Sequence, residues 1–429
     1  METIQLARLA RQAARRMTVL ESSVKNAALL RISEALQQNA EAILTANATD
    51  IARSTAEGLA APLLKRLRFD QSKLDDVVCG LQSLTKLADP VGHTQLATRL
   101  DDGLDLYRVS CPIGVIGVIF ESRPDALVQI SSLCLKSGNA VLLKGGSEAM
   151  ETNRTLVAVI SAASREAGLP DGWIGLLETR EEVSQLLAMD EEVDLLIPRG
   201  SNEFVRHIMD NTRIPVLGHA DGVCHIYIDA ACDWDMAIRL AVDSKTQYVA
   251  VCNAAETILL HASLENKLLD PLADALRKAK VEIFGCERVC ARLDCRPVTD
   301  WHTEYLDYKV SIRIVDSLDD AIEHINRYGS GHTEAIVTAD SAAAKRFMQE
   351  VDAGNTFWNC STRFSDGFRY GFGAEVGIST SKIHARGPVG LEGLMTYQYR
   401  MIGHGQIVAD YADGLKNFQH KAIGQNYPL

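Results

Sequence analysis

Hydrophobic residues recur along the chain at two different spacings. In residues 1–60 they repeat at the helical interval of three to four positions, as Leu6, Leu9 and Ala13 do. Helical spacing returns in residues 70–87. The first part of the chain is therefore predicted to be mainly helical.

From about residue 112 the pattern changes to near-continuous apolar runs that alternate with helical segments. The runs predict strands at 113–119, 140–144, 173–177, 193–197 and 214–217. Helices are predicted between them at 124–135, 148–167 and 202–211. A second set of strands is predicted at 225–228, 258–260, 310–315 and 335–337. Buried strands joined by helices indicate parallel sheets covered on both faces, so the fold class is α/β.

Composition limits the classes of protein that fit this pattern. A chain of 429 residues exceeds one ordinary core, so two or three domains are expected. Hydrophobic residues make up 47% and charged residues 23%, as in soluble globular proteins. The net charge of -12 argues against nucleic-acid binding. No apolar stretch reaches about 18 residues, and no signal peptide is recognisable at the N-terminus, so we expect neither a membrane partner nor secretion.

The 10 cysteines are scattered through the chain and do not form a disulfide framework. We therefore expect reduced thiols in a cytoplasmic protein. Cys286, Cys290 and Cys295 form a loose cluster, but it lacks a C-x-x-C pair, and no metal site is predicted. Cys360 lies close to polar loops, and we expect it to react adventitiously with thiol reagents.

Cys252 is the candidate nucleophile. It lies in the apolar turn QYVAVCNAAET at 247–257, where small neighbours leave room for a substrate carbonyl. Asn253 and local backbone N–H groups are suitable donors to an oxyanion. Many cysteines are only small core hydrophobes. However, ligands in α/β folds bind at the carboxyl ends of strands and between domains, which favours a cleft position for Cys252.

Lys144 ends a predicted strand and is followed by Gly145, Gly146, Ser147 and Glu148 at the start of a helix. A lysine there suits a ribose or a phosphate, although a solvated lysine in a turn fits the pattern equally well. Residues 198–201 provide a second helix N-terminus at the same sheet edge. Neither a G-x-G-x-x-G fingerprint after the first strand nor a triphosphatase phosphate loop is present. Loops carry further cations that could form an anion pocket: Arg123, Arg363, Lys382, His384 and Arg386.

The order of the motifs is more specific than any one of them. PIGVIGVI at 112–119, SGNAVLLK at 137–144, the cysteine turn and GPVG at 387–390 resemble the aldehyde dehydrogenase superfamily. Other segments resemble its gamma-glutamyl phosphate reductase family, namely FESRP at 120–124, LCLKSGN at 133–139, LIPRG at 196–200, GVCHIY at 222–227, STRF at 361–364, GAEVGIST at 373–380 and KIHARGP at 382–388. The resemblance covers nearly the whole chain. It fits the stand-alone reductase, since no N-terminal kinase segment is present.

The resemblance implies roles for individual residues. Cys252 would be the nucleophile, and Glu304 would hold the nicotinamide ribose. Arg123 replaces an asparagine that hydrolytic relatives use at the oxyanion, and whether it donates there or binds phosphate is open. The adenosine ribose and the rest of the cofactor would meet Lys144, Ser147, Glu148, Pro198, Arg199, Gly200 and Ser201. The substrate carboxylate and phosphate are expected at Arg363, Lys382 and Arg386.

One departure from the superfamily bears on the reaction. Hydrolytic relatives carry a water-activating glutamate before paired glycines, whereas the matching stretch here, PVLGHADG at 215–222, has none. We therefore expect a phosphorylating enzyme, which reduces L-glutamyl 5-phosphate to L-glutamate 5-semialdehyde through a cysteine thioester, in the second step of proline biosynthesis. The alternatives are a hydrolytic semialdehyde dehydrogenase and a catalytically silent binding protein. The residues leave NADP(H) against NAD(H) open, and the resemblance favours NADP(H).

The fold implied by the resemblance is that of an aldehyde dehydrogenase. A cofactor domain is expected at 1–228, interrupted near 99–111 by an oligomerisation hairpin. A catalytic domain is expected at 229–360. Residues 361–429 would carry substrate loops and return to the cofactor domain and an oligomerisation tail. We also expect a homo-oligomer and functional pairing with glutamate 5-kinase.

Overall fold

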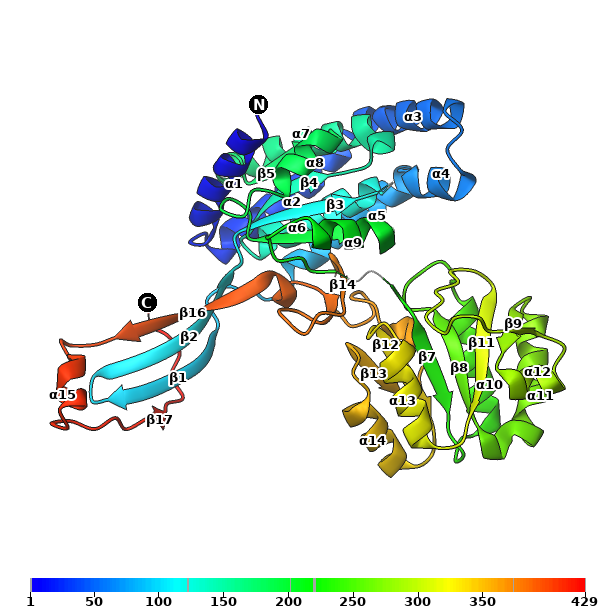
Figure 1. Cartoon of the computed structure of the whole chain (residues 1–429). Coiled ribbons are helices and arrows are strands. Elements are labelled where there is room, and N and C mark those ends of the chain that lie inside the picture. Colours follow the sequence, from blue (N-terminus) through cyan, green and yellow to red (C-terminus); the bar gives the residue numbers. More distant parts are fainter. Residues whose placement is uncertain (1, 122, 201, 219–220, 373, 429) are drawn as a thin grey trace.

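A computed structural model describes residues 2–121, 123–200, 202–218, 221–372 and 374–428 of the chain. The chain forms three parts: an N-terminal domain, a second domain and a projecting antiparallel sheet, here called the arm (Figure 1). Among the described residues, no helix is long and apolar enough to cross a membrane.

The N-terminal domain is built on a four-stranded parallel sheet. Its strands lie in the order β5 (Ile174–Leu177), β4 (Ala140–Lys144), β3 (Val115–Phe120) and β6 (Leu195–Arg199). Because side chains alternate along a strand, Ile116 and Val118 pack into one core while Val115 and Ile119 pack into the core on the opposite face. The helices of this domain are α1 (Thr3–Met17), α2 (Ser22–Gln38), α3 (Ala40–Ala56), α4 (Ala61–Leu67), α5 (Gln71–Thr85), α6 (Pro124–Lys136), α7 (Met150–Glu166), α8 (Arg180–Leu186) and α9 (Asn202–Asp210).

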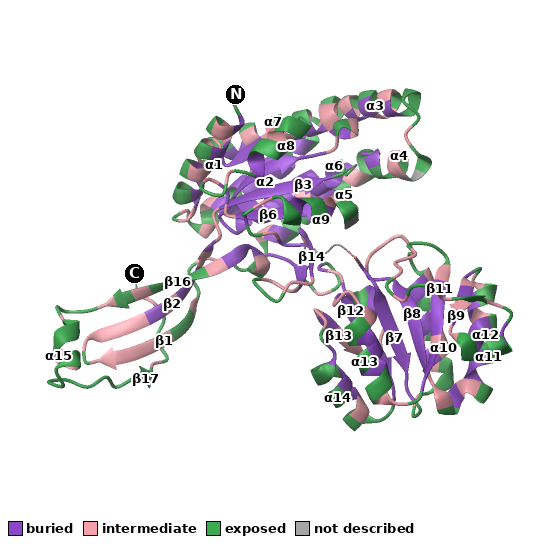
Figure 2. Cartoon of the chain, in the orientation of Figure 1, coloured by how far each residue is buried: buried purple, intermediate pink, exposed green. Residues whose placement is uncertain are grey.

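The second domain contains a seven-stranded parallel sheet. The strand order is β10 (Arg296–Pro297), β9 (Glu282–Gly285), β11 (Lys309–Val315), β8 (Ala255–His261), β7 (Cys224–Ile228), β12 (Thr333–Val337) and β13 (Asn355–Trp358). Its central strands are buried, as their uninterrupted apolar runs predict (Figure 2). The helices are α10 (Trp234–Thr246), α11 (Glu265–Lys278), α12 (Glu287–Arg292), α13 (Leu318–Tyr328) and α14 (Ser341–Glu350).

The arm is an antiparallel sheet in which the C-terminal segment joins an early hairpin. Its order is β16 (Met395–Ile402), β2 (Leu104–Pro112), β1 (Thr94–Asp101) and β17 (Lys421–Ala422), with α15 (Val408–Ala412) at its end. Its strands are largely half-buried or exposed (Figure 2). A small sheet of β14 (Gly377–Ser379) and β15 (Gly387–Val389) lies in the chain between β13 and the arm. Four 3-10 turns complete the secondary structure: η1 (Ser147–Ala149), η2 (Ala262–Leu264), η3 (Thr362–Phe364) and η4 (Glu392–Leu394).

Two boundaries and one strand differ from the sequence prediction. β7 pairs with β8 and β12, so the chain enters the second domain before Cys224 and not after residue 228. The hairpin begins at Thr94, earlier than the predicted 99. Residues 214–217 form only an isolated bridge, Leu196 to Val216, and no regular strand. An apolar run predicts a buried strand, but the run itself carries no information on which sheet it joins.

Candidate active site

Cys252 lies in the turn that joins α10 to β8, at the edge of the second domain. The turn is closed by a hydrogen bond from Ala254 N to Val251 O of 3.1 Å. Gly222 passes directly against it, because a Cβ atom at residue 222 would lie 2.4 Å from the Cα atom of Cys252. This close approach requires glycine, and it fixes the segment before β7 against the nucleophile turn.

The cysteine opens into a cleft of about 630 Å³ between the two domains. The N-terminal domain contributes the carboxyl ends of β3 and β6, the edge at which ligands bind in parallel sheets. The predicted residues among its lining are Arg123, Pro198, Arg199, Gly200, Cys252 and Glu304. Ser201 lies outside the described residues. The cleft therefore brings together parts of the chain that the sequence predicted separately.

His332 faces the nucleophile, and it is not among the residues predicted from the sequence. Its Nε2 atom lies 3.1 Å from the Sγ atom of Cys252, although the two residues are 80 positions apart. Its Nδ1 atom lies 2.8 Å from Thr333 Oγ1, and its carbonyl accepts a hydrogen bond of 2.9 Å from Asn355 Nδ2. His332 immediately precedes β12, in no recognisable motif. Only the strand order β8-β7-β12 could have indicated it.

Charges around the cysteine oppose its ionisation. Burial, together with the carboxylates of Glu375 and Glu304, raises the pKa of Cys252 to about 12, against the opposing effect of Arg199. Burial also raises the pKa of Glu375, against the effect of a hydrogen bond from Gly367 N to its Oε2 atom of 2.8 Å. Glu375 belongs to the motif at 373–380 and was not predicted as a site residue, yet it lines the cleft. A reaction at Cys252 therefore needs a group that takes the thiol proton.

Two guanidinium groups supply positive charge at the cleft. Arg123 Nη2 donates to Asp125 Oδ2 at 3.2 Å and leaves about half of its side chain exposed. Burial lowers the pKa of Arg199, the like charge of Arg123 lowers it further, and Glu375 and Cys252 oppose the shift. Guanidinium groups suit the planar binding of carboxylate and phosphate oxygens. The cleft thus has an anion-binding wall.

Asn253 anchors a loop in this structure. Its Nδ2 atom donates to Ser365 O at 2.7 Å, and its carbonyl accepts from Thr362 Oγ1 at 2.7 Å. Its Oδ1 atom is buried and has no hydrogen-bond partner among the described residues. The side chain is not among those that line the cleft. The predicted oxyanion role of Asn253 stays a prediction, and its observed contacts hold η3 against the nucleophile turn.

The three cations predicted for the substrate are not among the residues that line the cleft, although Arg363 is close enough to Cys252 to interact with it electrostatically. Arg363 is buried, where its Nε atom donates to Gln247 Oε1 at 2.9 Å and burial lowers its pKa. Lys382 and Arg386 both pair with Asp352, at 2.6 and 2.8 Å. Arg386 and His384 line a separate cavity of about 920 Å³ next to the arm. Their role in substrate binding stays a prediction, and in this structure Arg123 and Arg199 are the predicted cations that line the cleft.

The predicted ribose site lies at the carboxyl end of β4. Lys144 Nζ donates to Gly145 O at 2.5 Å, and burial lowers the pKa of this lysine. A Cβ atom at Gly146 would lie 2.0 Å from an oxygen of Glu148, so this carboxylate folds over the glycine. An ammonium and a carboxylate beside a glycine turn form a donor and acceptor set that fits ribose hydroxyls.

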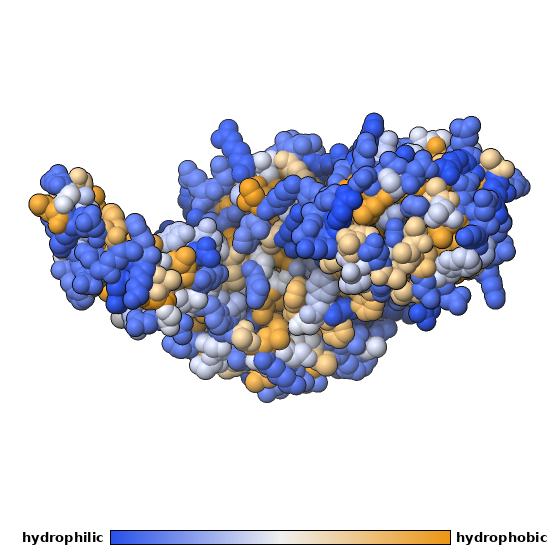
Figure 3. All heavy atoms as spheres, turned by 90° about the horizontal axis from the view of Figure 1, so that it is seen from below, coloured by the Kyte–Doolittle hydropathy of each residue, from blue (hydrophilic) through white to orange (hydrophobic). Residues whose placement is uncertain are grey.

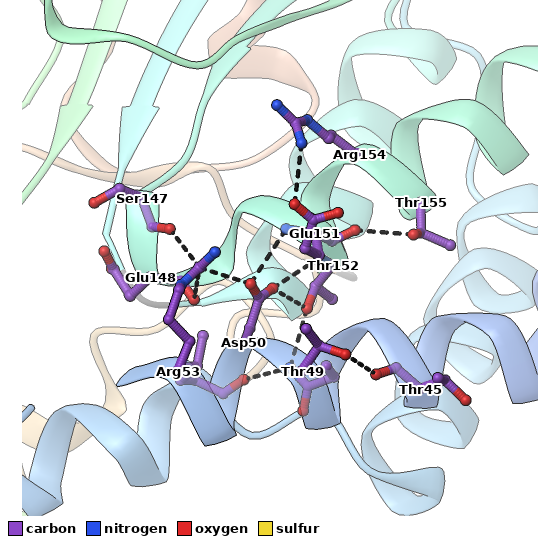
Figure 4. A network of polar contacts seen from close by, with 12 residues as sticks. Thr45, Thr49, Asp50, Arg53, Ser147, Glu148, Glu151, Thr152, Arg154 and Thr155 are labelled. Atoms are coloured by element: carbon purple, nitrogen blue, oxygen red, sulfur yellow. Dashed lines mark hydrogen bonds and ion pairs between the residues drawn. The ribbon is translucent and has the colours of Figure 1, made fainter. Parts of the chain in front are cut away.

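A polar network holds this loop from the adjacent helix α3 (Figure 4). Arg53 Nη2 donates to the carbonyls of Ser147 and Glu148, at 2.8 and 3.2 Å, and to Asp50 Oδ1 at 2.7 Å. Asp50 in turn accepts from Thr152 N at 2.8 Å and from Thr152 Oγ1 at 2.7 Å, near the start of α7. The turn that carries Ser147 and Glu148 is therefore positioned by α3. Within the described part of the chain, no cluster of three or more His, Cys, Asp or Glu residues is placed to hold a metal ion.

Comparisons with known proteins show the family to which the chain belongs. The profile of the aldehyde dehydrogenase family matches residues 2–284 and 310–399. A gamma-glutamyl phosphate reductase of Pelotomaculum thermopropionicum is 60% identical over 100% of this chain and 99% of its own. A second, of Acetivibrio thermocellus, is 60% identical over 98% of each chain.

Solved structures extend the comparison to the fold. The crystal structure of gamma-glutamyl phosphate reductase from Thermotoga maritima, 38% identical, matches 95% of this chain and 100% of its own with a TM-score of 0.93. Betaine aldehyde dehydrogenase of Staphylococcus aureus, solved in complex with NAD+, shares the fold at 18% identity and a TM-score of 0.64. With a match of this extent in sequence and in structure, the chain belongs to the gamma-glutamyl phosphate reductase family of the aldehyde dehydrogenases.

Proposed function

We propose that this enzyme reduces L-glutamyl 5-phosphate to L-glutamate 5-semialdehyde and phosphate, with NADPH as the reductant, in the second step of proline biosynthesis from glutamate. The observation that carries the proposal is the position of Cys252 in a cleft whose wall bears Arg123 and Arg199. An acyl phosphate needs a nucleophile for its carbonyl carbon and cations for its phosphate. The similarity to gamma-glutamyl phosphate reductases supports this choice of substrate.

The reaction follows from the residues of the cleft. The Cys252 sulfur attacks the acyl carbon, the bond from that carbon to the phosphate oxygen breaks, and a thioester remains. Backbone N–H groups of the nucleophile turn stabilise the tetrahedral oxyanion, each donor contributing about 3 kcal/mol. Arg123 and Arg199 bind the phosphate before and after it leaves. When bound, NADPH supplies the hydride that reduces the thioester carbonyl, after which Cys252 leaves as a thiolate and releases the semialdehyde.

The donor set along the sheet edge supports a dinucleotide. Lys144, Ser147 and Glu148 would hold the adenosine ribose. Glu304 would hold the nicotinamide ribose, and Glu375 is a second carboxylate in the same cleft that suits ribose hydroxyls. The preference for NADP over NAD rests on the family resemblance.

Hydrolysis is the second candidate function, since Glu304 and Glu375 are carboxylates close to Cys252. Each already accepts a backbone hydrogen bond, Glu304 from Gly222 N at 3.0 Å and Glu375 from Gly367 N at 2.8 Å. Such a bond stabilises the carboxylate, although burial still holds the pKa of Glu375 above its usual range. The stretch at 215–222 contains no glutamate, which favours exchange of the thioester with phosphate over hydrolysis.

The test is NADP-dependent oxidation of glutamate 5-semialdehyde, with and without phosphate, for wild type and Cys252→Ala. We expect activity that requires phosphate and disappears in the variant. Equal activity without phosphate would establish hydrolysis. Full activity in Cys252→Ala would exclude Cys252 as the nucleophile, and no reduction of NADP by wild type would point to a binding protein or to another cofactor.

We also propose that a second copy of the chain covers the arm. β16 is an edge strand, and Tyr397, Tyr399 and Met401 on it are 50%, 55% and 57% exposed. Hydrophobic residues are visible among the mainly hydrophilic ones of the arm (Figure 3). An unpaired edge with apolar side chains is a surface that proteins normally cover. Light scattering should give a multiple of the 46.9 kDa chain mass, and Met401→Glu should lower it. Pairing with glutamate 5-kinase stays a prediction.

A further inference from the structure

We propose that His332 is the base that takes the thiol proton of Cys252, an inference that rests on the nucleophile role of Cys252 in the proposed function. The imidazole Nε2 atom is 3.1 Å from the sulfur, which is within hydrogen-bond reach for a thiol donor. His332 is fully buried, so no bulk water competes for this contact. A buried imidazole aimed at a nucleophile is the arrangement by which cysteine nucleophiles are activated.

The site needs such a base. Burial and two carboxylates raise the pKa of the Cys252 thiol to about 12, and a free thiol of that pKa is ionised only on the order of one part in 10⁵ at pH 7. Transfer of the proton to a neighbouring imidazole replaces a lone buried anion by an ion pair of zero net charge. The pair costs far less in a buried site than the isolated thiolate does.

The second ring nitrogen is placed to select the tautomer. Nδ1 lies 2.8 Å from Thr333 Oγ1, and Cys224 Sγ is a weaker neighbour at 3.7 Å. A proton on Nδ1 that is donated to the Thr333 hydroxyl leaves Nε2 with its lone pair toward the thiol. Thr333 therefore orients the base.

The other charged groups near Cys252 and His332 have hydrogen-bond partners of their own or lie on the cleft side of the sulfur. Glu334, two residues beyond His332, accepts from His225 N at 2.7 Å and lies 3.0 Å from His225 Nδ1. Arg199, Glu304 and Glu375 act on the sulfur from the cleft side. Glu304 and Glu375 each accept a hydrogen bond from a backbone N–H group. His332 contacts the sulfur through a ring nitrogen.

The proton step is balanced as written. The proton moves from Sγ to Nε2, and the S–H electron pair stays on sulfur. That pair forms the bond to the acyl carbon, while the departing phosphate keeps the electrons of its bond to carbon. The imidazolium then gives its proton to the departing phosphate, and the thiolate released with the semialdehyde takes up a proton from solvent, so that the thiol and the neutral imidazole are both restored.

The test is alkylation of Cys252 by iodoacetamide between pH 6 and 10, followed by mass spectrometry of the peptide that contains it. Wild type should react at a nearly constant rate through the neutral range. His332→Gln should react about 100-fold more slowly at pH 7, with a rate that rises with pH as expected for an unassisted thiol. A wild-type rate proportional to hydroxide over the whole range, or the same profile in His332→Gln, would overturn the assignment.

Two further variants separate a base from a structural group. Thr333→Val keeps the imidazole but removes the acceptor of its Nδ1 proton, so it should slow alkylation at pH 7 by less than His332→Gln does. A wild-type profile in Thr333→Val would contradict the tautomer argument. Glu375→Gln removes a carboxylate that raises the pKa of the thiol, so it should raise the alkylation rate, whereas a large fall would make Glu375 the base.

Alkylation needs no acyl substrate, so this experiment is independent of the proposed reaction. If alkylation depends on His332 but glutamate 5-semialdehyde is not oxidised, the substrate is wrong and the base stands. If the semialdehyde is oxidised through Cys252 while alkylation ignores His332, the function stands and the base is wrong. Thermal unfolding followed by circular dichroism checks that each variant is folded.

Discussion

Lys245 and Glu256 form a buried ion pair that joins the two elements on either side of the nucleophile turn. Lys245 Nζ lies 2.5 Å from Glu256 Oε2, and both side chains are fully buried. Lys245 is in the last turn of α10, and Glu256 is in β8. The other carboxylate oxygen accepts from Leu306 N at 3.3 Å, at the wall of the cleft. Burial raises the pKa of Glu256 to about 7 in spite of the lysine.

Replacing Lys245 by Met should destabilise the fold by about 3–5 kcal/mol, because it leaves a buried carboxylate without its partner. Urea unfolding at pH 7.5 measures the loss. The double variant Lys245→Met/Glu256→Met should recover most of it. Arg346→Met, which breaks exposed pairs with Asp319 and Glu350, is the control and should change stability far less, because solvent screens exposed ion pairs. If Lys245→Met and Arg346→Met lowered the free energy of unfolding equally, burial would not explain the effect of Lys245.

His324 should make the protein sensitive to acid. Arg313 Nη1 donates to His324 Nδ1 at 2.6 Å, and burial lowers the pKa of His324 to about 2. The ring is neutral in the fold and takes a proton on unfolding below pH 6.5. The contribution of His324 to the free energy of unfolding is therefore fully present above pH 6.5. Below pH 6.5 this contribution falls by about 1.4 kcal/mol for each pH unit.

The measurement is the pH dependence of the free energy of unfolding between pH 7 and 5. His324→Gln keeps an acceptor for Arg313. It should reduce the slope of the free energy of unfolding against pH by the equivalent of one proton taken up on unfolding. His420→Gln, which changes an exposed histidine, should leave the slope as in wild type. A slope in His324→Gln that matches wild type would mean that His324 is already protonated in the fold.

Arg199 should govern the affinity for phosphate. Arg199→Met removes a charge-assisted donor from the cleft, and we expect the KM for phosphate in semialdehyde oxidation to rise about 10- to 100-fold. Arg199→Lys should recover part of the loss. Lys382→Met gives a direct comparison, because Lys382 pairs with Asp352 and does not line the cleft. If it raises the KM for phosphate as much as Arg199→Met does, the substrate role predicted from the sequence holds and that of Arg199 does not.

Arg53 should influence cofactor binding without contact to the reacting atoms. Arg53→Met removes two hydrogen bonds to the carbonyls of Ser147 and Glu148, so the loop loses its support from α3. We expect NADPH to bind about 10-fold more weakly, a loss of about 1.4 kcal/mol. Fluorescence titration of NADPH measures the affinity. Arg31→Met, which breaks an exposed pair with Glu166, should bind NADPH like wild type.

Gly222 should tolerate no side chain. In Gly222→Ala the new methyl would lie 2.4 Å from both Cα and O of Cys252, so the nucleophile turn must move. We expect activity to fall at least 10-fold and stability to fall by about 1–3 kcal/mol. Gly80→Ala in α5 is the matched control, since its Cβ would meet nothing within 4 Å and should stabilise the helix slightly. Normal activity in Gly222→Ala would contradict the close approach.

The sequence by itself determined the local elements and the nucleophile turn. α6 and β4 agree with the prediction closely, because helix period, a proline at the helix start and an apolar run are local signals. The motif order was sufficient to indicate the family, and Cys252, Arg123 and Arg199 lie in one cleft.

Only the tertiary structure decided which distant residues meet. β7 joins the second sheet, and this places His332 at the start of the neighbouring strand beside Cys252. Lys382 and Arg386 share a segment with Glu375, yet they pair with Asp352 while Glu375 lines the cleft with Cys252. Periodicity records which residues are buried, but contacts between strands depend on strand order, which is settled by packing over the whole chain and leaves no local signal.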